Sequence, residues 1–146
     1  MAENKPQPKE LLVYTDAASR GNRGPASIGY LILDAEKNHI ESNAKHIGDH
    51  TNNEAEYEAL IWAMDRASAH CRECVTFHSD SELVVRQVNG VYRVKKDNLR
   101  PYVEKILTKR AFFKSFELVH VPRSNTYIVT VDGLVNDVLD KEGFSR

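Results

Sequence analysis

The chain has 146 residues, of which 41% are hydrophobic and 28% are charged, a composition typical of one globular domain. Its 20 lysine and arginine residues nearly cancel its 21 aspartate and glutamate residues, which excludes a nucleic-acid binder with a basic charge over the whole molecule. No apolar run is long enough to cross a bilayer, and the polar N-terminal segment lacks the apolar centre of a secretory signal. We therefore expect a flexible tail over residues 1–9, a single domain over residues 10–146 and a cytoplasmic location.

The first part of the chain predicts three antiparallel strands. Residues 10–16 alternate between apolar and polar side chains and are rich in β-branched and aromatic types, and the turn-rich AASRGNRGP follows them. Two further extended segments, residues 27–33 and 39–47, flank the polar sequence DAEKN. This order predicts a meander of three strands and places Asp16 at or near the end of the first strand.

Residues 51–67 predict a helix with one acidic side chain on its apolar face. Thr51 and Glu54 have the spacing of a capping box, in which each side chain accepts a hydrogen bond from a backbone N–H of the first turn. Glu56 instead lies among the alanine, leucine and methionine side chains that should pack on the sheet. Either the apolar stripe ends early and Glu56 reaches solvent, or Glu56 is a metal ligand, because a buried carboxylate needs compensation.

The second half of the chain predicts strands that alternate with helices. In order, they are a strand over residues 75–78, a short helix over residues 81–90, a helix over residues 99–113 and a strand over residues 116–121. Asp80 therefore follows the fourth strand. The final segment starts with β-branched residues, so we place the start of its helix at about Val131. The pattern predicts α/β layers in which the later strands are parallel.

Three acidic side chains are predicted to lie close together in the fold. If the first helix covers the sheet and the fourth strand lies beside the first, the carboxylates of Asp16, Glu56 and Asp80 converge. Close carboxylates repel one another, so such a cluster persists only with shared protons or with bound divalent cations. Because hard oxygen ligands favour Mg²⁺ or Mn²⁺, the sequence predicts a metal site suited to phosphoryl chemistry.

Four motifs together resemble the type I ribonucleases H, in the compact form found in archaea and several bacteria. They are YTDAASRGNRGP, TNNEAEYEAL, SDSELVVRQVNGVYRVK and DGLVNDVLD, in the order that the family has. The resemblance implies a ribonuclease H-like α/β fold, with a five-stranded mixed sheet and helices on both faces, in agreement with the pattern above. It also implies an acidic quartet of Asp16, Glu56, Asp80 and Asp132.

The same resemblance implies an endonuclease that hydrolyses the RNA strand of RNA–DNA hybrids and leaves 5′-phosphate and 3′-hydroxyl ends. The expected cofactor is a pair of Mg²⁺ ions, for which Mn²⁺ can substitute. The expected partner is the hybrid duplex, with double-stranded RNA as a further candidate, and the expected state is a monomer. Two alternatives stay open: a hybrid- or duplex-binding module of the same fold with reduced catalysis, and another metal-dependent nuclease of the superfamily, such as a junction resolvase.

Uncharged donors near the acidic quartet are candidates for positioning the substrate. They are Asn22, Thr51, Asn52 and Asn53, and hybrids are recognised largely by shape and by contacts to 2′-hydroxyl groups. A simple turn at Asn22 and a helix cap at Thr51 are the alternative interpretations, and both roles can coexist.

Basic residues in two places supply further candidates. Between the second and third helices lie Arg86, Arg93, Lys95, Lys96 and Arg100, where other type I enzymes carry a long basic protrusion; a solvated charge run is the alternative. Many family members also have a histidine in the loop before the last aspartate, but this loop is PRSNTYIVTV. Arg123 is its nearest side chain able to contact phosphate.

Overall fold

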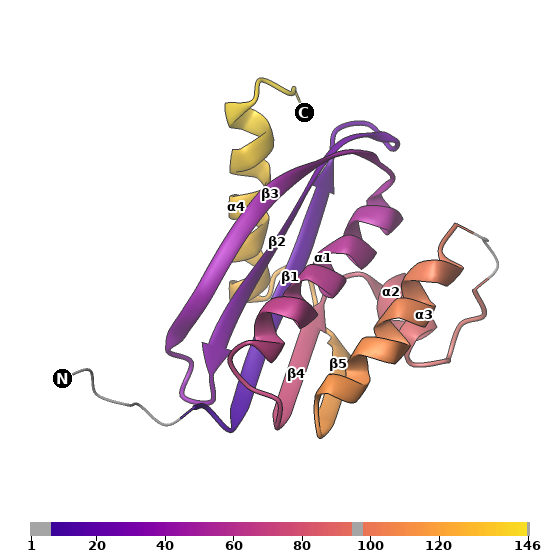
Figure 1. The fold of residues 1–146 in the computed structure, drawn as a ribbon. Helices are drawn as coiled ribbons and strands as arrows, with labels where there is room; N and C mark the ends of the chain where they lie inside the picture. Colours follow the sequence, from indigo (N-terminus) through magenta and orange to yellow (C-terminus); the bar gives the residue numbers. More distant parts are fainter. Residues whose placement is uncertain (1–6, 95–97, 146) are drawn as a thin grey trace.

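The computed structural model describes residues 7–94 and 98–145, and within them one mixed sheet carries helices on both faces (Figure 1). The strands are β1 (Glu10–Ser19), β2 (Gly24–Asp34), β3 (His39–His50), β4 (Cys74–Ser79) and β5 (Ser115–His120). Their order in the sheet is β3-β2-β1-β4-β5. The first three strands are antiparallel, whereas β4 is parallel to both β1 and β5. The predicted fold class is confirmed.

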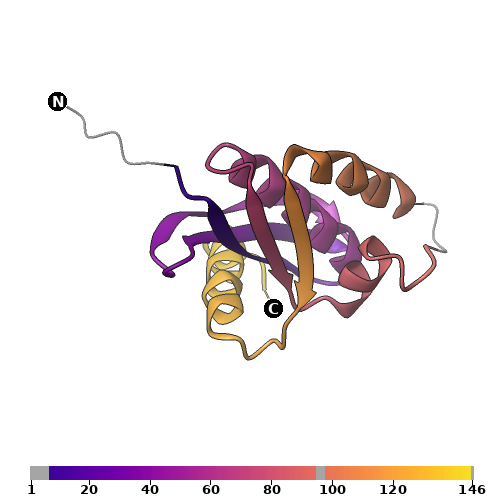
Figure 2. The same cartoon turned by 90° about the horizontal axis from the view of Figure 1, so that it is seen from below.

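The helices divide between the two faces of the sheet (Figure 2). They are α1 (Asn52–Ser68), α2 (Glu82–Val88), α3 (Arg100–Lys109), which a 3₁₀ turn over Arg110–Phe112 extends, and α4 (Thr126–Lys141). The first three pack on one face over the larger core, and α4 covers the other face over a smaller core. Among the described residues, no helix combines the length and the apolar character that a membrane span requires.

The start of α1 follows the predicted capping box. The Oγ1 atom of Thr51 accepts a hydrogen bond from the backbone N–H of Glu54 at 3.1 Å, and Oε1 of Glu54 accepts one from the N–H of Thr51 at 2.9 Å. Two donors of the first turn are thereby satisfied. The cap fixes the first turn of α1 and therefore the phase with which its later side chains meet the sheet.

The first strand is longer than its sequence pattern indicates. β1 continues past Asp16 to Ser19 because Ala17 and Ala18 pair with Ile28 and Ser27 of β2. The small alanine side chains have low strand propensity, and the antiparallel pairing overrides it. The chain then reverses through Gly21, which has a φ of +81° that favours glycine.

The last helix begins earlier than Val131, so that prediction is wrong. α4 starts at Thr126, where Oδ1 of Asn125 accepts hydrogen bonds from the N–H groups of the next two helical positions at 2.9 and 3.2 Å. Two of the β-branched residues that suggested a strand, Ile128 and Val131, face the sheet and are fully buried, whereas Val129 between them is 54% exposed. Burial of this apolar face outweighs the modest helix propensity of β-branched side chains.

Candidate active site

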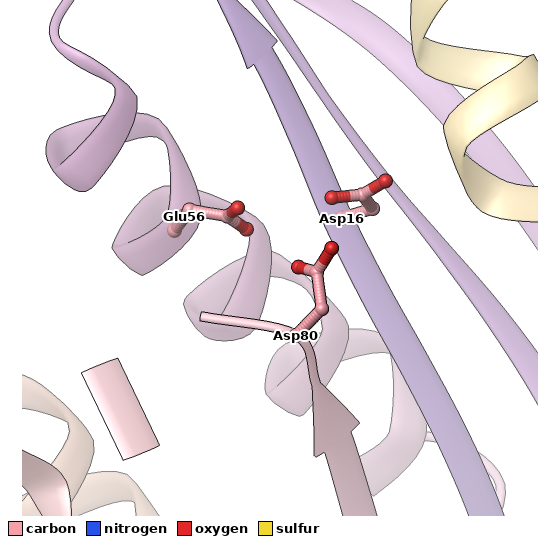
Figure 3. A group of neighbouring side chains, drawn as sticks. All are labelled: Asp16, Glu56 and Asp80. Atoms are coloured by element: carbon pink, nitrogen blue, oxygen red, sulfur yellow. The ribbon is translucent and has the colours of Figure 1, made fainter. Parts of the chain in front are cut away.

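Three carboxylates from distant parts of the chain meet beside the carboxyl end of β4 (Figure 3). Oxygen atoms of Asp16, Glu56 and Asp80 all lie within 4.8 Å of one another. The parallel pairing of β1 and β4 ends at Tyr14 and His78, so Asp16 and Asp80 each follow the last paired residue by two positions. Glu56 approaches them from α1. The predicted convergence of these side chains is therefore observed.

The three carboxylates are poorly compensated by the protein itself. Oε1 of Glu56 is buried and has no hydrogen-bond partner among the described residues. Burial, and then the negative charges of Asp16 and Asp80, raise the pKa of Glu56 well above its ordinary value. Burial and the charge of Asp80 likewise raise the pKa of Asp16 to about 8, although the N–H of Ala17 donates to its Oδ1 at 2.9 Å. The donor set and its unpaired buried oxygen fit a divalent cation.

Glu54 shows the contrast between a satisfied and an unsatisfied carboxylate. It is buried like Asp16, yet it accepts hydrogen bonds from the N–H of Thr51, from Nη1 of Arg23 at 2.9 Å and from Nδ2 of Asn98 at 3.1 Å. The backbone hydrogen bond from Thr51 is the main reason that the pKa of Glu54 is lowered. The structural role predicted for Glu54 is confirmed, and Glu56 alone on this helix turns an unpaired carboxylate toward the other two acids.

Asp132 lies at the wall of the same site rather than in the cluster. A cavity of about 590 Å³ is lined by all four acids of the predicted quartet. Asp132 is exposed in the second turn of α4, and its negative charge contributes to the raised pKa values of Asp16 and Asp80. α4 thus brings the fourth acid to the cavity from the face of the sheet opposite to α1.

The predicted substrate-binding residues fall into two groups. Asn52 and Asn53 line the cavity, whereas Asn22 and Thr51 support its rim: Oδ1 of Asn22 accepts a hydrogen bond from the N–H of Asn52 at 2.8 Å, and Thr51 caps α1. The predictions for Lys95 and Lys96 lie outside the described residues.

Arg123 places a positive charge beside the carboxylate cluster. It lines the cavity, and its Nε lies 3.9 Å from Oδ2 of Asp80 although the side chain is 94% exposed. Its charge lowers the pKa values of Asp16, Glu56 and Asp80, in opposition to burial. The loop before α4 thus places the Arg123 guanidinium group beside Asp80, and its contact with substrate phosphate stays a prediction.

The residues that line the cavity and were not predicted as site residues include two with long polar side chains or amides, Arg20 and Asn136. Arg20 follows β1, and Asn136 lies on α4. No local sequence pattern connects Arg20 to residues more than a hundred positions away, so its place in the cavity could not be predicted from the sequence. Asn136 lies four positions after Asp132, and this spacing on a helix was a usable signal.

The sheet order, with a carboxylate cluster built from Asp16 within β1, Asp80 just after β4 and Glu56 on α1, defines a ribonuclease H-like fold with an acidic centre. A family model described as "Reverse transcriptase-like" matches residues 14–133. A ribonuclease H of Syntrophus aciditrophicus is 31% identical over an alignment of 158 positions, gaps included, that covers 99% of this chain and 86% of that protein. The chain belongs to the type I ribonuclease H family.

Two further relatives extend this comparison. Ribonuclease HI of Halobacterium salinarum is 33% identical over 127 residues, which cover 87% of this chain and only 63% of that protein. LC11-RNase H1, whose crystal structure contains an RNA/DNA hybrid, has a TM-score of 0.83 and 38% identity, with 90% of this chain and 98% of that chain covered. The chain therefore spans less than two thirds of the length of the Halobacterium protein but nearly the whole of the LC11 chain.

Proposed function

We propose that the protein hydrolyses the RNA strand of RNA–DNA hybrids with two divalent cations held by Asp16, Glu56, Asp80 and Asp132. The observation that carries this proposal is the buried, unpaired carboxylate oxygen of Glu56 beside two other acids. Such an arrangement is costly without a cation, and protein folds retain it where the cation has a use. The family relationship and the hybrid bound by LC11-RNase H1 support this substrate.

The residues of the site have distinct tasks in this reaction. When bound, two Mg²⁺ ions would activate a water molecule and stabilise the leaving 3′ oxygen, which gives 5′-phosphate and 3′-hydroxyl ends. The N–H of Ala17 holds Asp16 in one orientation through Oδ1. Arg123 lies beside Asp80 and is able to bind a phosphate oxygen with its guanidinium group.

The surroundings of the acidic cavity suit a duplex with two different strands. Asn53 lines the acidic cavity and also a second, more apolar cavity of about 470 Å³, whose walls include Leu83, Tyr92 and Arg93. We propose that the RNA strand lies over the acids and that the DNA strand lies toward the second cavity. The amides of Asn52 and Asn53 then contact the groove between the strands, where 2′-hydroxyl groups distinguish RNA from DNA.

A cleavage panel tests the proposal. End-labelled RNA–DNA hybrid, double-stranded RNA, double-stranded DNA, single-stranded RNA and a four-way junction are each incubated with the protein in Mg²⁺ and in EDTA. We expect cleavage of the RNA strand of the hybrid in Mg²⁺ only, with 5′-phosphate products, and none by Asp16→Asn. Retention of the hybrid without cleavage in both buffers would favour a binding module, and preferential cleavage of the junction would favour a resolvase.

A further inference from the structure

Asp132 has a different kind of support from the other acids of the site. It is exposed, so burial does not fix its side chain, and an exposed aspartate on a helix samples several rotamers. Asn136, four positions later on α4, donates from Nδ2 to Oδ1 of Asp132 at 3.1 Å and to the carbonyl oxygen of Asp132 at 3.0 Å. One oxygen of the Asp132 carboxylate is therefore held by the neighbouring amide.

The amide of Asn136 is in turn held by Arg20, the residue that follows β1. The Arg20 side chain is only 7% exposed, and its Nη2 donates to Oδ1 of Asn136 at 2.9 Å. Because a guanidinium group has donors and no acceptor, the amide must turn its oxygen to Arg20 and its NH₂ group to Asp132. The same guanidinium group also donates to Asp140 at 3.1 Å and to the carbonyl oxygen of Phe144 at 2.6 Å.

We propose that Arg20 and Asn136 are positioning residues that hold Asp132 in the geometry for binding a cation. Arg20 fixes the amide, and the amide restrains Oδ1 of Asp132, which leaves Oδ2 for the metal. An arginine paired directly with Asp132 would neutralise the carboxylate and compete with the cation. The intervening amide transmits the fixed position of Arg20 without placing its charge on the ligand.

The alternative role for Arg20 is to anchor the end of the chain, since it also binds Asp140 and Phe144. Substitution of Arg20 alone would therefore mix the two roles. Asn136 separates them, because Asn136→Ala removes the amide while the contacts of Arg20 to Asp140, to Phe144 and to the backbone carbonyl of Asn136 remain available. Alanine also favours the helix.

The inference rests on the proposed function for its effect on hydrolysis, so its principal test is metal binding. Isothermal titration calorimetry with Mn²⁺ compares the wild-type protein, Asn136→Ala and the matched control Asp137→Ala, which changes an exposed residue next to it on α4. We expect Mn²⁺ to bind Asn136→Ala about tenfold more weakly, within the range found for residues that support metal ligands. Asp137→Ala should bind Mn²⁺ as the wild-type protein does.

A double-mutant comparison locates the effect. In an Asp132→Asn background, Asn136→Ala should weaken Mn²⁺ binding no further, because the carboxylate on which it acts is already absent. In hybrid cleavage, Asn136→Ala should lower kcat about tenfold and leave KM within about twofold, with the melting temperature within about 2 °C of the control. A folded Arg20→Lys protein keeps the positive charge but loses the planar guanidinium group and its several N–H donors, so it should resemble Asn136→Ala in Mn²⁺ affinity.

Three results would overturn the inference: Asn136→Ala binds Mn²⁺ like the wild-type protein, its effect persists undiminished in the Asp132→Asn background, or folded Arg20→Lys retains the wild-type affinity. The proposed function fails by a different observation, namely that the wild-type protein binds Mn²⁺ and cleaves no hybrid. In that case the calorimetric comparison still decides whether Asn136 and Arg20 support the metal site.

Discussion

Replacement of Asp16 by asparagine is expected to stabilise the metal-free protein at alkaline pH while it abolishes hydrolysis. Asp16 is 4% exposed, and burial together with the charge of Asp80 raises its pKa to about 8. An acid of this kind keeps its proton longer in the folded than in the unfolded state. Between about pH 4 and pH 8 the unfolded chain therefore binds fewer protons than the folded one, and the free energy of unfolding falls as the pH rises.

The size of this effect follows from the pKa difference. A rise from 3.8 to about 8 is roughly four pKa units, which at about 1.4 kcal/mol per unit sets an upper limit on the order of 6 kcal/mol. Asp16 shares its titration with Glu56 and Asp80, and local relaxation raises the effective dielectric constant, so we expect about 2 kcal/mol between pH 5 and pH 8. The asparagine keeps an oxygen that accepts from the N–H of Ala17.

The assay is urea denaturation in EDTA at pH 5 and pH 8, followed by circular dichroism. At pH 8 we expect Asp16→Asn to exceed the wild-type free energy of unfolding by about 2 kcal/mol, with a smaller difference at pH 5. The control Glu36→Gln alters an exposed carboxylate between β2 and β3 and should follow the wild-type protein. If the free energy of unfolding depended equally on pH in Asp16→Asn and in the wild-type protein, the reasoning would be refuted, because burial would then not disfavour the ionised form of Asp16.

Three other substitutions test separate parts of the structure. Glu56→Gln should lose most of its turnover, with hybrid binding in EDTA unchanged. Glu54→Gln should stay active and lose about 1 kcal/mol of the free energy of unfolding, because glutamine also closes a capping box. The reverse result in steady-state kinetics would exclude Glu56 as the metal ligand. Gly29→Ala should cost about 2 kcal/mol in thermal denaturation because its Cβ would lie 2.8 Å from Cγ1 of Val135 on α4, and an unchanged melting temperature would contradict that packing. Arg123→Ala should move the acid limb of the pH–activity profile a few tenths of a unit upward at low salt, because the neighbouring carboxylates lose the charge that lowers their pKa values, and a downward shift would contradict this.

Local patterns in the sequence were sufficient for part of this structure. The capping box of Thr51 and Glu54 depends on residues three positions apart, and helix phase placed Glu56 on the apolar face, although it left open whether Glu56 reaches solvent or binds a metal. The predicted convergence of Asp16 and Asp80 depended on the fourth strand lying beside the first, and both the pairing and the convergence are observed. Their catalytic role stays a prediction, as do the tail over residues 1–9 and the single domain.

Other features depend on contacts that no local pattern encodes. The start of α4 was placed too late because β-branched residues favour strands, and only burial against the sheet makes Ile128 helical. The pairing of Arg20 with Asn136 joins residues 116 positions apart. Glu54 likewise accepts a hydrogen bond from Asn98, 44 positions away, and its spacing from Thr51 in the capping box did not indicate this contact.

The hydrophobic core that joins α4 to the sheet is smaller than the main core under α1, and this difference has a consequence for the order in which the fold opens. The smaller core joins α4 to the sheet through Ile128, Val131 and Val135, and it is separate from the larger core under α1. Local opening of α4 therefore requires less free energy than global unfolding, and it removes Asp132 while the strands keep Asp16 in place. A cation bound by Asp132 on α4 together with Asp16 on β1 would favour the closed state by mass action, so cation binding and the attachment of α4 would be linked equilibria.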